Sequence, residues 1–389
     1  MTIDHTIMTT RDEIIIWFNI PPKVEKGAFN YLSKHWPSKV YYVILNDLAQ
    51  YRKNNGWDDS DFGNAEVIRL WEEMEVDDRI KTICMNHPRA IHIINGFTNT
   101  IQRKVRRALK GTSTRIGVYT ERPNYLGGFS ERLARRIGLY LKYTAIRFRD
   151  DHDTDFVLPL GEQGMKAFAS FGWSKDKLYR FMYNPNSVFP NPTFRKISSP
   201  IRFVYVGRFS FKTKGVDILM KACSYLYGSW TLDFVGGYGI DSDKVLKWIN
   251  AHDNTRFIGS WKADQVVTNL QDYDVVIVPS KYDGWNLLVN ESIASGIGCI
   301  SSDETVSHEL IATSGAGGIY HWRNPKELAK LMQLVIDNPE IAQQWKSKAY
   351  SFRPSISSES VGEYLIEILN YVYYRDTVME RNSPRCPWL

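Results

Sequence analysis

The chain has 389 residues, 43% of them hydrophobic and 24% charged, with a net charge of +6. This balance excludes a disordered chain and allows two domains with buried cores, while the positive charge favours an acidic partner. We expect a cytoplasmic protein, since there is no 20-residue apolar run, no signal-peptide pattern and no CxxC pair among the four cysteines.

Strand-like and helix-like runs alternate through the first half. Runs rich in Ile, Val and aromatic residues predict strands at 13–19, 39–45, 90–95, 114–120 and 155–160. Helical spacing of apolar residues predicts helices at 27–36, 65–74, 98–110 and 130–148. Such alternation is typical of a parallel sheet in an α/β fold.

A proline-rich stretch, 183–200, reads as an interdomain linker, after which the alternation restarts. Strands are predicted at 201–206, 231–235, 255–258, 274–278, 298–302 and 318–321. Helices are predicted at 216–226, 242–251, 263–271, 287–295, 325–337 and 358–374. We therefore expect two Rossmann-like domains, 1–190 and 191–357, that face a central cleft, followed by a helix and tail at 358–389 that pack back toward the first domain.

The stretch from Asp274 to Gly296 is the most informative. A continuous apolar run leads into the turn Asp283-Gly284 and then into a helical segment, the unit that places a ligand at a strand's carboxyl end. Asp283 and Glu291 bracket this turn. One carboxylate could act near a phosphate while the other holds a more distant part of the same nucleotide.

A second element follows the first strand of the second domain. Gly207-Arg208 comes directly after that strand, and Lys214-Gly215 stands at a helix start six residues later. Two cations beside a helix amino terminus suit a diphosphate, although by themselves they would read as surface charges. The glycine turn at 236–239, which contains Gly237, allows close backbone approach, but it lacks the spacing of a dehydrogenase fingerprint.

Two segments of the first domain are strongly basic. The predicted helices 102–110 and 131–149 carry clustered cations, the second around Leu133, Ile137, Leu141 and Ile146. Either could rest on an anionic membrane or grip a phosphate-bearing acceptor, and either could be a solvated face. Nucleic acid is the weaker reading, because no binding-fold signature accompanies the charges.

Metal and hydrolase chemistry find little support. Acidic pairs between Asp151 and Asp155 could hold a divalent metal on a sugar diphosphate, but such tripeptides are common by chance. The histidines lack zinc-ligand spacing, and no Gly-x-Ser-x-Gly elbow occurs. No metal site and no cofactor are expected.

Taken together, these residues resemble the retaining GT-B glycosyltransferases of family 4. The motifs that carry the resemblance are VGRFSFKTKG from Val206, FVGGYG, TRFIGSW from Thr255, and PSKYDGWNLLVNESIASG from Pro279. The last is similar to the family's Glu-x7-Glu signature, with Asp283 in place of the first glutamate.

The resemblance implies roles for these positions. Arg208 and Lys214 would neutralise the donor diphosphate, Asp283 would contact the donor sugar and Glu291 would bind the ribose hydroxyls. The donor site would be completed by backbone and strand-end positions, namely Gly207, Gly237, Ile258, Asn286, Leu287 and Leu288. No metal is implied, since the two cations face the leaving-group charge.

The first domain matches the family less closely. Only Gly27 stands where the family often has a double-glycine loop, and Thr120, Glu121 or Arg122 takes the place of a histidine near the sugar. Glu121 could equally be a surface residue paired with Arg122. These four positions are the expected acceptor side.

The expected function is metal-independent transfer of a sugar, with retention, from a nucleotide-diphosphate-sugar to an acceptor hydroxyl. A UDP-sugar is favoured, and the acceptor would be a surface polysaccharide, lipopolysaccharide or lipid-linked oligosaccharide at the inner face of the cytoplasmic membrane. The alternatives are a GT-B nucleotide-sugar epimerase and a non-catalytic nucleotide-binding assembly protein.

Overall fold

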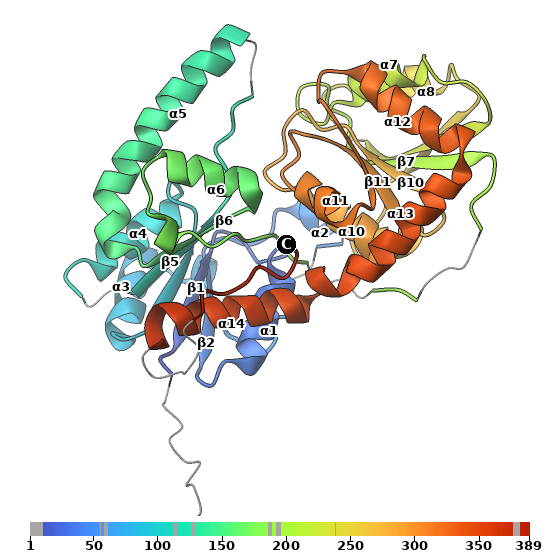
Figure 1. Ribbon diagram of the computed structural model, residues 1–389. Coiled ribbons are helices and arrows are strands. Elements are labelled where there is room, and N and C mark those ends of the chain that lie inside the picture. Colours follow the sequence, from blue (N-terminus) through green and yellow to red (C-terminus); the bar gives the residue numbers. More distant parts are fainter. Residues whose placement is uncertain are drawn as a thin grey trace, which may run out of the picture.

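The computed structural model describes residues 11–54, 56–57, 61–112, 115–126, 129–185, 189–191, 196–237, 239–375 and 382–389. Two six-stranded parallel sheets form its framework, each with helices on both faces (Figure 1). The strand orders are β3-β2-β1-β4-β5-β6 and β12-β11-β10-β7-β8-β9. Each order reverses beside its first strand, at β1/β4 and at β7/β10, which is where Rossmann-like sheets bind ligands.

The first sheet belongs to what we term the first domain. Its strands are β1 (Ile14–Phe18), β2 (Val40–Ile44), β3 (Glu66–Arg69), β4 (Ile91–Asn95), β5 (Arg115–Thr120) and β6 (Phe156–Pro159). Its helices are α1 (Lys26–His35), α2 (Gln50–Asn54), α3 (Val76–Asn86), α4 (Thr100–Leu109), α5 (Phe129–Asp150) and α6 (Gly161–Ser170). The strand β1 reads IIIWF and is buried throughout, as a strand covered on both faces must be.

The second domain surrounds the other sheet. Its strands are β7 (Ile201–Arg208), β8 (Trp230–Gly237), β9 (Thr255–Gly259), β10 (Val275–Val278), β11 (Gly298–Ser302) and β12 (Gly317–Tyr320). Its helices are α7 (Val216–Cys223), α8 (Ser242–Ile249), α9 (Val266–Leu270), α10 (Leu287–Ser295), α11 (His308–Ser314), α12 (Pro325–Asp337) and α13 (Pro339–Phe352). The central strand β10 reads VVIV and is fully buried.

The prediction of a helix at 65–74 is wrong. Residues 66–69 form β3, which pairs in parallel with β2, and a short 3-10 turn follows at Leu70–Glu72. Partner strands decide the outcome here, because pairing with β2 places Val67 and Ile68 against the apolar clusters of the sheet. The helices α2, α3, α6, α11 and α13 had not been predicted.

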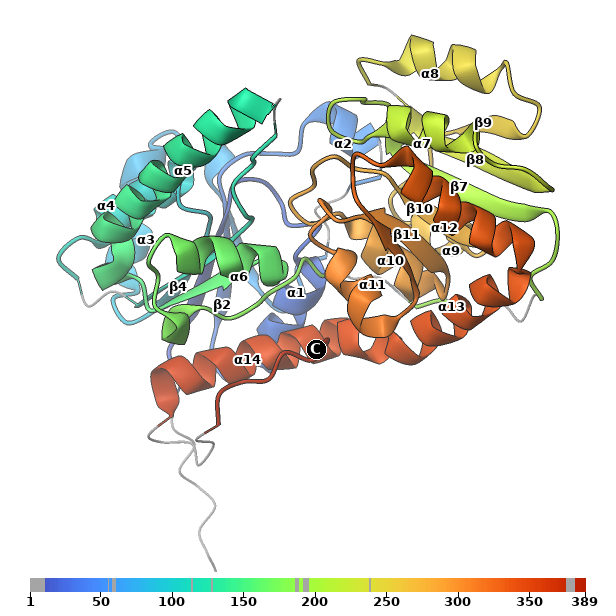
Figure 2. The ribbon, with the colours of Figure 1, turned by 45° about the horizontal axis from the view of Figure 1, so that its top comes forward.

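The last helix, α14 (Ser358–Tyr374), runs from the second domain back beneath the first, as expected (Figure 2). It packs along α1, where Gly362 lies directly against the side chain of Tyr31. Tyr373 Oη donates to Asp155 Oδ2 at 2.9 Å and Tyr374 Oη donates to Asp12 Oδ2 at 2.9 Å. The helix therefore ties the two domains together.

One apolar cluster crosses the domain boundary. It includes one face of β1 and of α1, Phe181 and Met182 of the connecting chain, and Trp285 just before α10. Among the described residues, no helix is long and apolar enough to span a membrane.

Candidate functional site

The centre of the site is an ion pair between the loops that follow β7 and β10. Lys214 Nζ lies 2.6 Å from Asp283 Oδ2. The two strands are adjacent and parallel, so their carboxyl ends meet at one edge of the sheet. The loops are also joined through the backbone, since the Lys281 amide donates to the Thr213 carbonyl at 2.8 Å. The two motifs singled out in the sequence thus converge at one point.

The backbone conformation and close surroundings of Gly215 explain why a glycine follows Lys214. It has a φ of +65°, and a Cβ on it would lie 1.8 Å from the carbonyl oxygen of Pro279. Any side chain would push the two loops apart. The glycine therefore lets Lys214 approach the β10 loop closely enough to reach Asp283.

Asp283 is held by several donors. Besides Lys214, Asn286 Nδ2 lies 2.9 Å from Oδ2, and Ser280 Oγ lies 3.4 Å away. Asn286 has a φ of +79°, the one positive φ on a non-glycine residue within the described part of the chain. Its Oδ1 also accepts from the Leu288 amide at 3.0 Å and so caps α10. The Leu288 amide, one of the expected donor-site positions, therefore donates to the Asn286 side chain.

Glu121 reaches this centre from the first domain. Its Oε1 accepts from Tyr183 Oη at 3.0 Å, and its Oε2 would lie 2.0 Å from a Cβ added to Gly284. Burial raises the pKa of Glu121 and the charge of Asp283 adds to that rise, while Tyr183 and Lys214 oppose it. The residue as a whole is nevertheless solvent-exposed. An acceptor-side candidate and a donor-side candidate therefore face each other across the interface.

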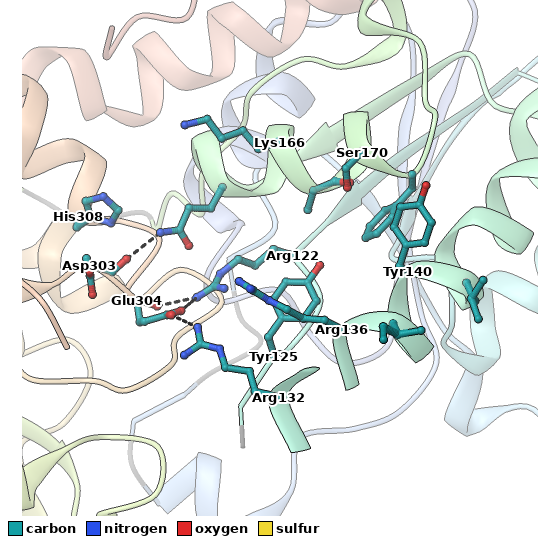
Figure 3. Close-up of a pocket in the computed structure, with 15 residues that line it drawn as sticks. Arg122, Tyr125, Arg132, Arg136, Tyr140, Lys166, Ser170, Asp303, Glu304 and His308 are labelled. Atoms are coloured by element: carbon teal, nitrogen blue, oxygen red, sulfur yellow. Dashed lines mark hydrogen bonds and ion pairs between the residues drawn. The ribbon is translucent and has the colours of Figure 1, made fainter. Parts of the chain in front are cut away.

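Arg122 does not pair with Glu121. Its Nη2 donates to the carbonyl oxygen of Glu304 at 2.8 Å and to Oε2 of the same residue at 2.9 Å, and Arg132 binds the other carboxylate oxygen (Figure 3). The suggested Glu121–Arg122 surface pair is thus replaced by an interdomain ion pair. The reason is geometric: consecutive residues leaving β5 point in different directions, one toward Asp283 and the other toward Glu304.

The remaining donor-side candidates lie at strand ends. Arg208 is exposed at the end of β7, with Gly207 before it and Gly237 opposite it on β8. Ile258, on β9, is 42% exposed. These positions border the edge where Lys214 stands, and within the described part of the chain none of them forms a hydrogen bond or ion pair with Lys214 or Asp283. Leu287 begins α10 directly after the Asn286 cap.

Glu291 lies one turn into α10 and faces the first domain. Burial raises its pKa to about 7, and the charge of Lys23, in the loop after β1, opposes the rise. Lys23 was not predicted from the sequence. Its position could have been, because it follows a strand at the topological switch point of the first sheet.

A polar cavity of about 370 Å³ opens at that same loop. Lys23, Glu25, Tyr119, Glu121 and Tyr183 are among its lining residues. Glu25 is only 6% exposed, and burial raises its pKa to about 7, helped by the charge of Glu121. The side chain of Tyr119 is buried beside Glu25 in this cavity. The cavity thus offers hydrogen-bonding groups for a hydroxyl-rich ligand, and neither Glu25 nor Tyr183 had been predicted.

Two of the acceptor-side candidates, Gly27 and Thr120, have structural contacts within the first domain and its connection to the second. The Gly27 amide donates to the Asn184 carbonyl at 2.8 Å, and a Cβ there would meet Asn184 Oδ1 at 2.1 Å. This glycine is needed so that α1 can lie against the interdomain connection. Thr120 is buried at the end of β5, where its hydroxyl donates to the Glu121 carbonyl at 3.2 Å.

The acidic side chains at 151–155 form ion pairs and hydrogen bonds with other residues of the protein. Asp151 accepts from Lys177 Nζ at 3.2 Å, Asp153 pairs with His152, and Asp155 accepts from Tyr373 and from the Ile116 amide. No group of three or more His, Cys, Asp or Glu side chains suited to a metal occurs among the described residues.

Two Rossmann-like domains with parallel six-stranded sheets whose strand ends meet at one interface form the GT-B fold. Residues 192–352 match the family model described as glycosyl transferases group 1. The resemblance expected from the motifs is thereby confirmed at the level of fold and family model.

Solved structures of similar proteins support the same fold. The structure of WaaB, a lipopolysaccharide outer core galactosyltransferase, has a TM-score of 0.64 at 15% identity, covering 91% of this chain and 99% of that one. Anabaena HepE in complex with UDP-glucose has a TM-score of 0.67 at 14% identity, covering 92% and 100%. These likenesses establish the fold.

A sequence relative is the lipopolysaccharide 1,6-galactosyltransferase of Escherichia coli K12, 28% identical over 165 residues, or 40% of this chain and 44% of the relative. The chain spans about half the length of the curated relatives it matches.

Proposed function

We propose that the protein is a glycosyltransferase that moves a sugar from a nucleotide-diphosphate-sugar to an acceptor hydroxyl, with retention of anomeric configuration. The observation that carries the proposal is the meeting of Lys214, Asp283 and Glu121 at the interface of the two domains. A cation for the leaving phosphate and two carboxylates for sugar hydroxyls are the groups that glycosyl transfer needs.

Lys214 would act on the leaving group. As the glycosidic bond breaks, negative charge grows on the diphosphate, and a fixed ammonium stabilises that charge more in the transition state than in the ground state. The ammonium is ion-paired with Asp283. Donor binding would therefore exchange part of this ion pair for a phosphate contact, with Arg208 at the neighbouring strand end supplying a second cation.

Asp283 and Glu121 would bind the transferred sugar and the acceptor. Asp283 is already ion-paired and hydrogen-bonded, which lowers its nucleophilicity and suits a hydroxyl-binding role. Retention would then follow from attack by the acceptor on the face that the nucleotide leaves. Glu291, whose pKa lies near 7, would accept hydrogen bonds from the ribose once ionised.

We propose a UDP-sugar as donor and a glycan or lipid-linked acceptor in lipopolysaccharide or polysaccharide synthesis. The support is the similar HepE structure, which is a complex with UDP-glucose, together with the lipopolysaccharide galactosyltransferases among the similar proteins. The exposed cations of α4 and α5 would favour an anionic membrane surface, so binding to anionic liposomes should weaken as salt increases.

The test uses a panel of UDP-, GDP- and ADP-sugars with glycan and lipid-linked acceptors. We expect acceptor-dependent release of nucleotide, largest for a UDP-sugar, and NMR of the product should show the donor's anomeric configuration. Conversion of the nucleotide sugar without acceptor would instead identify an epimerase. Binding with no turnover for any acceptor would favour an assembly protein.

A further inference from the structure

A second cavity, of about 780 Å³, lies beside the site and between the two domains (Figure 3). The helices α5 and α6 form its first-domain wall, and the segment from Asp303 to His308, which leads into α11, forms the other. None of the residues assigned to the donor lines it. It is therefore a separate binding space.

One side of this cavity is apolar. Ile137, Tyr140 and Leu141 of α5 line it together with Phe171 at the end of α6. Ile137 is 55% exposed and Leu141 is 62% exposed. Exposing such side chains on a helix that projects from the domain is unfavourable unless a ligand covers them (Figure 1). This wall suits a hydrocarbon chain.

The other lining groups include more cations than carboxylates. Arg122, Arg132, Arg136 and Lys166 contribute four positive charges, against the two carboxylates of Asp303 and Glu304. Arg122 and Arg132 share Glu304 as their partner, so these three side chains carry one excess positive charge, whereas Lys166 pairs with Glu162 of its own helix at 2.6 Å.

Arg122 has hydrogen-bonding capacity left for a ligand, and Arg136 lies over an aromatic ring. Arg122 is only 6% exposed, and its Nε has no hydrogen-bond partner among the described residues. The guanidinium of Arg136 lies 5.4 Å from the ring centre of Tyr125. Planar guanidinium groups in this arrangement suit a phosphate better than a neutral headgroup.

The cavity leads to the reaction centre. Arg122 lines it, whereas the preceding residue, Glu121, faces Asp283. Tyr282 joins the two, because its hydroxyl donates to the Arg122 carbonyl at 3.1 Å and its ring stacks under the Arg122 guanidinium at 4.8 Å. A molecule held at Arg122 would place its adjoining group next to the transferred sugar.

We infer that this cavity binds the acceptor, and that the acceptor is a lipid phosphate: an apolar chain against α5 and a phosphate or diphosphate at Arg122 and Arg136. The inference rests on the proposed sugar transfer and names its acceptor class. A free phosphate would leave the apolar wall uncovered, and a water-soluble glycan would leave both the apolar wall and the excess positive charge unmatched.

The test measures binding of farnesyl phosphate, below its aggregation concentration, by titration calorimetry. The double variant Arg136→Ala/Lys166→Ala removes two lining cations. Its matched control, Arg135→Ala/Lys142→Ala, removes two exposed cations of α5 that do not line the cavity. We expect wild type and control to bind alike and the cavity variant to bind at least tenfold more weakly, about 1.4 kcal/mol.

Three ligand comparisons make the result specific. Farnesol and inorganic phosphate should each bind at least tenfold more weakly than farnesyl phosphate, and equal binding of either would overturn the inference. Equal losses in both double variants would also overturn it, because they would indicate attraction to the helix surface, as to an anionic membrane. UDP binding to the same samples separates the claims: if UDP binds and farnesyl phosphate does not, the acceptor inference fails while the donor site stands.

Discussion

Glu121 and Gly284 belong to different domains, yet they lie so close that a Cβ at position 284 would come within 2.0 Å of Glu121 Oε2. The glycine of the Asp-Gly turn therefore has a role beyond turn formation. It admits a carboxylate of the first domain to the neighbourhood of Asp283 and Lys214. This contact is the structural basis for treating the two domains as one site.

Replacing this glycine tests the contact. We expect Gly284→Ala to displace the Glu121 carboxylate and to lower kcat/KM for sugar transfer at least tenfold, since misplacement by about 1 Å costs up to 10²-fold. The matched control is Gly138→Ala on α5, where an added Cβ meets nothing within 4 Å. Unchanged transfer by Gly284→Ala would show that Glu121 has no part in the reaction.

The ion pair makes a sharper prediction. Lys214→Ala should lower kcat about 10²-fold, the loss typical of removing one preorganised group that stabilises developing charge. Asp283→Asn keeps the shape and should lower transfer less, chiefly by weakening sugar binding. Circular dichroism must show that both variants are folded. Full activity in both would mean that the site assignment is wrong.

Glu25 predicts a pH dependence of stability. Burial raises its folded pKa from an ordinary 4.5 to about 7, so the folded state holds a proton that the unfolded state has lost between these values. Stability should therefore fall as pH rises from 5 to 8, by on the order of 3 kcal/mol from this group. Glu25→Gln cannot ionise and should become more stable than wild type at pH 8.

Urea unfolding at pH 5 and at pH 8 measures this effect. Glu72→Gln, at an exposed position, is the control and should follow wild type. If Glu25→Gln loses stability with pH as steeply as wild type does, Glu25 is not the group responsible.

Metal independence is a further prediction. Lys214 and Arg208 are expected to supply the charge neutralisation that a divalent ion would otherwise give, and the acidic side chains at 151–155 already bind protein donors. Transfer should therefore persist in EDTA. Activity that EDTA abolishes and manganese restores would overturn this prediction.

Much of the framework could be read from the sequence, because buried parallel strands appear as continuous apolar runs and glycines mark their ends. The helix Ser358–Tyr374 was predicted with its observed bounds. The segment 66–69 was misread, because pairing with β2 overrides its helical spacing. Local spacing carries no information about such partners.

The residues of the site also fall into two groups, those that the sequence predicts and those that it does not. Lys214 and Asp283 come from motifs with a fixed spacing after two strands, so the sequence alone could bring them together. Arg122 and Glu304 are 182 positions apart and meet only across the domain interface. No periodicity signals a pair of this kind, and the same holds for Glu25, whose neighbour Glu121 comes from another strand.

The central claim is that the edge formed by β7, β10 and α10 binds a nucleoside diphosphate, and titration calorimetry with UDP tests it most directly. Wild type should bind UDP, whereas Lys214→Ala and Glu291→Gln should each weaken binding about tenfold or more, through the phosphate and the ribose respectively. Failure of wild type to bind UDP, GDP or ADP would contradict the claim, as would UDP binding that neither substitution alters.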